Sequence, residues 1–135
     1  MESPKTKLVI LLEVPIGRIF ERREIDQLAQ TAVVPILGSR QYRMLAAEHS
    51  AAAQVTAYLA AALDHWEIIE VNRLLNLDIF PRSDENYREL LAWLTATTRQ
   101  HPNLVLVTHH PVADGDLPRY FRGLLEDAEF HLVRL

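Results

Sequence analysis

Apolar positions along this chain follow two different periods. Runs of consecutive apolar residues, typical of strands buried on both faces, occur at residues 8–12 and 104–107. Between these runs, apolar residues recur every three or four positions, as in Ile25, Leu28, Ala29 and Ala32, which is the spacing of one helix face. Strands alternating with helices predict a parallel sheet covered by helices on both faces.

Turn and cap residues divide the chain into predicted elements. Five strands are expected, at residues 7–14, 32–37, 66–71, 103–109 and 130–135. The longest helix is expected from an N-cap at Ser39 to about Leu63, because alanine and leucine dominate that segment. Two further helices are expected after the cap residue Ser83 and from Pro118, a residue suited to a first helical turn.

Two strand orders are compatible with this alternation. The flavodoxin-like order is 2-1-3-4-5, and the Rossmann-like order, which PIN-like nuclease domains use, is 3-2-1-4-5. Pro35 lies in the second expected strand and cannot donate a hydrogen bond to a neighbouring strand, so it favours an edge position. Only the flavodoxin-like order places that strand at an edge, and it is therefore favoured.

Length and composition set limits on the class of protein. The chain has 135 residues, 49% hydrophobic and 24% charged, which predicts one α/β domain over residues 1–135 folded as a three-layer sandwich. It contains no cysteine, which excludes a thiol nucleophile and a disulfide framework and fits a cytoplasmic protein. No signal peptide or membrane span is expected, and the net charge of -4 argues against a general nucleic-acid coat protein.

Ligands of open parallel sheets bind beyond the carboxyl ends of the strands, so residues following the strands are the candidate site. Glu13 closes an apolar strand, where a charge is costly unless it is paired or coordinated. We expect it to be a catalytic acid–base or metal-binding carboxylate, or else to be turned outward by the pleat of the strand or paired with an arginine such as Arg18. His109 and His110 are candidate catalytic histidines, and as neighbours in a strand they point to opposite faces.

Two acids and a group of basic and polar residues complete the candidate site. Asp114 and Asp116 are expected to join Glu13 around Mg²⁺ or Mn²⁺, or to serve as ordinary turn and cap residues. A phosphorylated ligand is expected to bind where a helix opens directly after the second strand, at Gly38 and Ser39. The other expected ligand-binding residues are Arg18, Arg40, Arg43 and Thr108. Glu48, His49, His65 and His101 are interpreted as structural.

Three families resemble parts of this pattern. Residues 103–112, NLVLVTHHPV, are similar to the His-His-Pro strand end of calcineurin-like metallophosphoesterases, although the other motifs of that family are missing. The placement of Glu13, Asp114 and Asp116 resembles the acids of PIN-like nucleases. Glu13 and Thr108 are placed as in response-regulator receivers, but Asn72 stands where those domains carry the phosphoacceptor aspartate.

These observations leave the function open between classes. The favoured hypothesis is a small binding or signalling module that recognises a phosphorylated ligand, such as a nucleotide, or a protein partner at the carboxyl ends of its strands. The alternative is a metal-dependent phosphoesterase or PIN-like nuclease that uses Glu13, Asp114 and Asp116. A third hypothesis is an interaction subunit in which the alanine-rich helix forms a homodimer. Whether the chain is an enzyme does not follow from its sequence.

Overall fold

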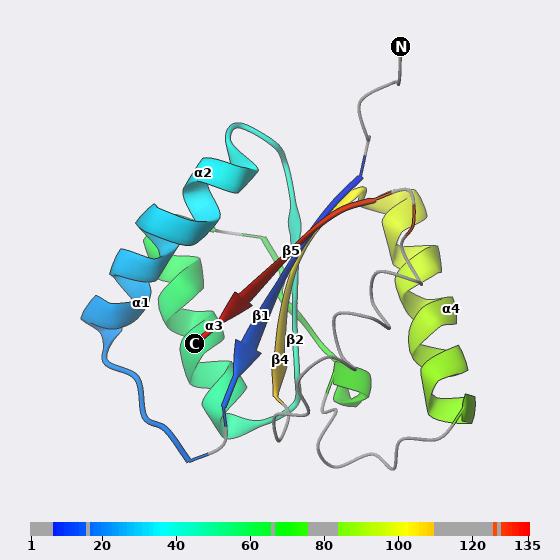
Figure 1. Cartoon of the computed structure of the whole chain (residues 1–135), viewed down its shortest axis with the longest axis horizontal. Helices are drawn as coiled ribbons and strands as arrows, with labels where there is room; N and C mark the ends of the chain where they lie inside the picture. Colours follow the sequence, from blue (N-terminus) through cyan, green and yellow to red (C-terminus); the bar gives the residue numbers. More distant parts are fainter. Residues whose placement is uncertain (1–6, 16, 66, 76–83, 110–125, 127) are drawn as a thin grey trace.

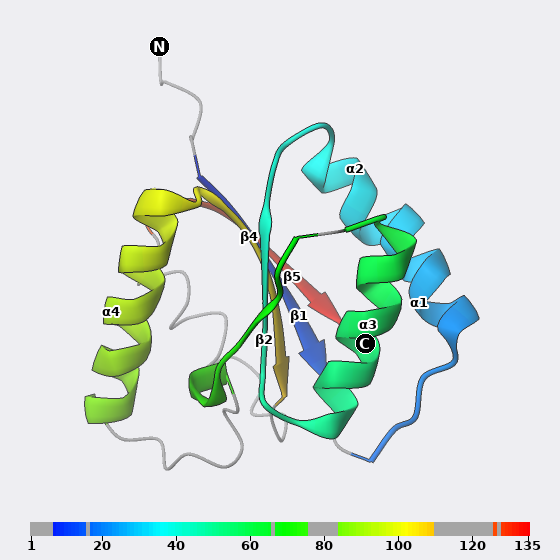
Figure 2. The same cartoon turned by 180° about the vertical axis from the view of Figure 1, so that it is seen from behind.

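A computed structural model describes residues 7–15, 17–65, 67–75, 84–109, 126 and 128–135. It contains a five-stranded, all-parallel sheet with helices on both faces, as the alternating pattern predicts. Three helices, α1 (Arg22–Leu28), α2 (Val34–Leu37) and α3 (Ser50–Ala62), cover one face (Figure 1). Helix α4 (Asp84–Gln100) covers the other face, and the view turned by 180° in Figure 2 again shows it on the side of the strands away from α1, α2 and α3.

The strands run in the order β3-β2-β4-β1-β5. Their bounds are β1 Lys7–Val14, β2 Arg43–Ala46, β3 Glu70–Val71, β4 Asn103–His109 and β5 Ala128–Arg134. Residues 8–12 of β1 and 104–107 of β4 are completely buried, so these two strands form the middle of the core as predicted. The strand order is neither of the two predicted orders, because β4 pairs with both β1 and β2 and separates them.

The first error behind the strand order is the predicted strand at residues 32–37. This segment continues the helix begun by α1, through a π-helical turn (Ala29–Val33) into α2. Pro35 lies in the first turn of α2 and not at a sheet edge. A proline inside a helical run cannot donate the helical hydrogen bond, and the π-helical turn ends at Val33, two residues before it. Gly38 ends the helical run with a positive φ of 56°, a conformation that glycine adopts readily.

The second error is the long helix expected from Ser39. Arg43–Ala46 instead forms β2, which lies between β3 and β4, and the helix begins only at Ser50. Met, Leu and Ala favour helices locally, but pairing with two neighbouring strands and complete burial of Met44 and Leu45 override that preference. Ala52, Val55 and Leu59, which recur at helical spacing in α3, are buried in the core.

The other predicted strands and helices are present in the structure where their residues are described. The expected strand at residues 66–71 is shorter, with only Glu70–Val71 paired. Helix α4 lies where a helix was expected after Ser83, and the last strand begins two residues before the predicted 130. Ser83, and the turn and helix expected around Pro118, lie outside the described residues.

Candidate functional site

The carboxyl ends of β1, β4 and β5 meet at one edge of the sheet, here called the carboxyl edge. In the registers of these strands, Glu13 lies beside Thr108 on one side and Arg134 on the other. Paired residues of a parallel sheet point to the same face, so these three side chains share a face. The structure therefore brings Glu13 and Thr108 together, as expected, and adds Arg134.

Glu13 is the buried acid of this edge. Its side chain is 7% exposed, and its Oε2 atom lies 3.3 Å from Nε of Arg134, whose side chain is 49% exposed. The Arg134 guanidinium compensates the carboxylate while remaining in contact with water. Of the alternatives for Glu13, pairing with an arginine is observed, but the arginine is Arg134 and not Arg18. Thr108 donates its hydroxyl hydrogen to the carbonyl oxygen of Leu12 at 3.2 Å.

His109 lies on the opposite face, because it follows Thr108 in the strand. It is 1% exposed, and its ring stacks on His49 with centroids 3.7 Å apart and planes 10° from parallel. His49 is the N-cap of α3, where its Nδ1 atom accepts a hydrogen bond from the backbone N–H of Ala51 at 3.2 Å. A neutral His49 therefore carries its hydrogen on Nε2. The sheet separates this histidine pair from the carboxylate of Glu13.

His49 lies at this edge and was interpreted from the sequence as structural, without its role as an N-cap being predicted. Histidine is a rare N-cap beside Ser, Thr, Asp and Asn, and the helix start was expected at Ser39. Three other predicted site residues, His110, Asp114 and Asp116, lie outside the described residues. Within the part that is described, no group of three or more His, Asp or Glu side chains is arranged to hold a metal ion.

Four of the six predicted phosphate-binding residues lie at the opposite edge, here called the amino edge. Gly38, Ser39 and Arg40 precede β2 and Arg43 begins it, so they flank the starting ends of the strands. This contradicts their expected place beside Glu13. Gly38 also ends a helix and does not open one, so the partial positive charge of a helix N-terminus is missing there. The misplaced second strand is the cause of both errors.

The side chains of the amino edge contact other groups of the fold. Arg40 lies 3.7 Å from Glu129 of β5, with both side chains exposed, and Arg43 lies 3.1 Å from Nε2 of His101. Tyr42 stacks on His65 with ring centroids 4.9 Å apart and planes at 27°.

Burial and nearby charges shift two ionisable groups at the amino edge. Burial lowers the pKa of His65; the charge of Glu67 opposes this change and that of Arg43 adds to it. Burial is also the largest cause of the raised pKa of Tyr42, with the charges of Glu67 and Asp64 adding to it. Both pKa shifts favour the neutral form of the side chain, so each of these two rings stays uncharged over a wider pH range than it would in water.

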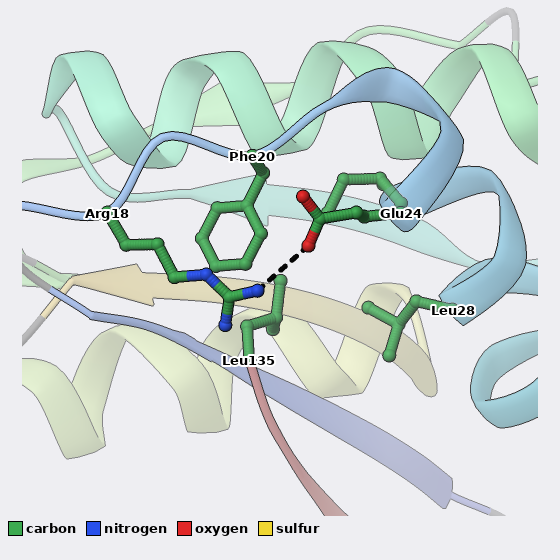
Figure 3. A pocket seen from close by; sticks show the side chains of 6 residues that line it. Arg18, Phe20, Glu24, Leu28 and Leu135 are labelled. Atoms are coloured by element: carbon green, nitrogen blue, oxygen red, sulfur yellow. Dashed lines mark hydrogen bonds and ion pairs between the residues drawn. The ribbon is translucent and has the colours of Figure 1, made fainter.

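A small pocket opens at the carboxyl edge, between the start of α1 and the end of β5 (Figure 3). Its volume is about 150 Å³, and its lining residues are Arg18, Phe20, Glu24, Ile25, Leu28 and Leu135. Arg18 lies over the ring of Phe20, with Cζ 4.4 Å from the ring centroid, and donates from Nη2 to Oε2 of Glu24 at 2.8 Å. The pocket thus combines an apolar floor with an ion pair at its mouth.

No protein-family model and no curated protein matches the chain. Among the described helices, none combines the length and the apolar character needed to cross a membrane.

Proposed function

We propose that this chain is a binding module that recognises a protein partner at the carboxyl edge of its sheet, in the pocket lined by Arg18 and Phe20. The observation that carries the proposal is the apolar floor of this pocket beside an exposed isoleucine. Ile19 is 82% exposed, and its two neighbours in the chain both line the pocket. An apolar cavity flanked by exposed apolar and charged groups is typical of the centre and rim of a protein interface.

A protein partner is better supported than a phosphorylated ligand. The arginines expected to bind phosphate, Arg40 and Arg43, lie at the amino edge, away from the pocket. Arg18 is the expected ligand-binding residue that does line the pocket, and the floor beneath it is apolar. Phosphate groups are bound by several charged donors, whereas an apolar side chain gains affinity from burial in such a floor.

The test compares two exposed isoleucines of similar exposure. Ile19 beside the pocket is 82% exposed and Ile68, before β3, is 79% exposed, so each can become serine with little effect on folding. Peptides that bind the full chain are selected from a library of random displayed peptides, and their affinity is then measured for both variants. We expect I19S to weaken binding about tenfold, because the bound peptide would no longer bury an isoleucine side chain at this position. I68S should leave binding unchanged. Equal binding to I19S and the unchanged chain, or no enrichment, would contradict the proposal.

A metal-dependent phosphoesterase or nuclease is the second candidate, favoured by the burial of Glu13 at the carboxyl edge. The proposed ligands of Mg²⁺ or Mn²⁺ are Glu13, Asp114 and Asp116. Thermal unfolding with and without millimolar metal tests it, since a ligand at 100 times its Kd adds about 2.7 kcal/mol of stability. We expect such a shift to be lost in D114N and D116N. No shift in the unchanged chain would rule this candidate out.

A further inference from the structure

We propose that the pocket beside Arg18 accepts a leucine- or phenylalanine-sized side chain that is followed in the partner by an acidic residue, whose carboxylate binds Arg18. This inference rests on the proposed function and specifies the chemistry of the partner. It depends on three properties of the pocket: its size, the fixed position of the Arg18 guanidinium, and the hydrogen-bond donors that this guanidinium offers at the mouth.

The size of the pocket fits one apolar side chain. Its volume is about 150 Å³, and Phe20, Ile25, Leu28 and Leu135 supply apolar lining. A cavity of roughly this volume lined by leucine, isoleucine and phenylalanine binds a single benzene molecule. A leucine or phenylalanine side chain is of comparable size, whereas alanine leaves most of the space unfilled and gains less from burial.

The fold fixes the position of the Arg18 guanidinium. Glu24 receives the Arg18 hydrogen bond on Oε2, and its Oε1 accepts from the backbone N–H of Glu21, the N-cap of α1, at 3.3 Å. The guanidinium also lies over the ring of Phe20, with Cζ 4.4 Å from the ring centroid (Figure 3). An exposed pair such as Arg18 and Glu24 adds little stability, so its main effect is to orient Arg18 before a ligand arrives.

The mouth of the pocket offers donors more readily than acceptors. A guanidinium has five N–H donors, and the bond to Glu24 uses one of them. The carboxylate of Glu24 has about four acceptor positions, and the hydrogen bonds from Arg18 and Glu21 use two of them, so more donors than acceptors stay available. A carboxylate matches the fork of an arginine in shape and charge, so an acidic partner residue can pair with the remaining donors of Arg18. A basic partner residue would have to compete with Arg18 for the carboxylate of Glu24.

Four short peptides test this chemistry on the full chain. Each is a capped glycine–serine peptide with Leu-Asp, Leu-Asn, Leu-Lys or Ala-Asp at its centre, and binding is followed by amide NMR shifts during titration. We expect Leu-Asp to bind about tenfold more tightly than Leu-Asn, since the Asp carboxylate adds a negative charge and a second acceptor oxygen for Arg18 that the Asn amide lacks. Leu-Lys and Ala-Asp should bind more weakly still, and the shifts should centre on Phe20 and Leu28.

A matched pair of arginine variants separates the two proposals. R18Q should remove the preference for Leu-Asp over Leu-Asn, whereas R22Q, which changes an exposed arginine outside the pocket lining, should retain it. Equal affinity for Leu-Asp, Leu-Asn and Leu-Lys at this pocket would overturn the acidic preference and leave the proposed function standing. Shifts confined to other surfaces, or absent with all four peptides, would contradict both. A preference for Leu-Asp that persists in R18Q would also overturn the role of Arg18.

Discussion

Each edge of the sheet holds an arginine–carboxylate pair and a pair of stacked rings, but their surroundings differ. At the carboxyl edge Glu13 is buried against half-exposed Arg134, whereas at the amino edge Arg40 and Glu129 are both exposed. The carboxyl-edge rings of His49 and His109 are closer and more nearly parallel than those of Tyr42 and His65. Similar residue types therefore lie in different surroundings at the two edges. We expect the buried ones to contribute more to the free energy of unfolding.

The largest expected effect comes from removing the buried acid. We expect E13A to lower the free energy of unfolding by about 2 kcal/mol, because the ion pair of a buried carboxylate is lost from between two strands. The matched change at the amino edge, E129A, should cost less than about 0.5 kcal/mol, since its pair with Arg40 is exposed. Urea denaturation of both variants measures the difference. Equal losses would show that burial does not distinguish the two edges.

A smaller effect is expected from His49, which combines a cap with a stacked ring. We expect H49A to lose about 1–2 kcal/mol, of which the cap supplies roughly 1 kcal/mol and the stack the remainder. H49N restores an N-cap side chain without the stack and should recover about half of the loss. H65A, which removes the looser amino-edge stack, should cost less than H49A. If H49N is as unstable as H49A, the hydrogen bond to Ala51 makes no measurable contribution.

The smallest expected effect is a pH dependence specific to the amino edge. The pKa of His65 is lowered in the folded chain, mainly by burial, so on acidification the unfolded chain takes up this proton first. The stability linked to His65 is thus fully present well above its ordinary pKa near 6.5 and is lost as the pH falls through the lower folded value. H65F keeps a ring against Tyr42 without titrating.

The pH dependence of the free energy of unfolding is measured by denaturing H65F and the unchanged chain between about pH 7.5 and pH 5.5, which covers the ordinary titration range of histidine. The free energy of unfolding should fall less steeply with acidification in H65F than in the unchanged chain. Parallel slopes in the two proteins would mean that His65 makes no contribution to the pH dependence.

The sequence was most informative where one physical effect dominated the local pattern. The uninterrupted apolar runs of β1 and β4 predicted buried parallel strands, and Glu13 stood out because a charge is costly at the end of such a strand. The four residues of β2 gave no such signal, since Met, Leu and Ala also favour helices. Their strand conformation depends on β3 and β4, which are distant in the sequence.

The candidate site was predictable only in part, for the same reason. Arg134 pairs with Glu13 through the register of β1 and β5, which no local pattern contains. The phosphate-binding expectation for Ser39 and Arg40 depended on a strand that is in fact helical, so it moved to the wrong edge. The pocket is formed by segments that are far apart in the sequence, such as those that contain Arg18 and Leu135. It could therefore be found only from the fold.

The central position of β4 has a consequence for how the chain folds during synthesis. β1 has no pairing with β2 and gains its partners only when Asn103–His109 and Ala128–Arg134 have been made. Its apolar run therefore stays without a strand partner while most of the chain emerges from the ribosome. Contacts between such distant segments slow folding. We expect nascent chains that stop before β4 to be prone to aggregation and to depend on chaperones that bind apolar segments.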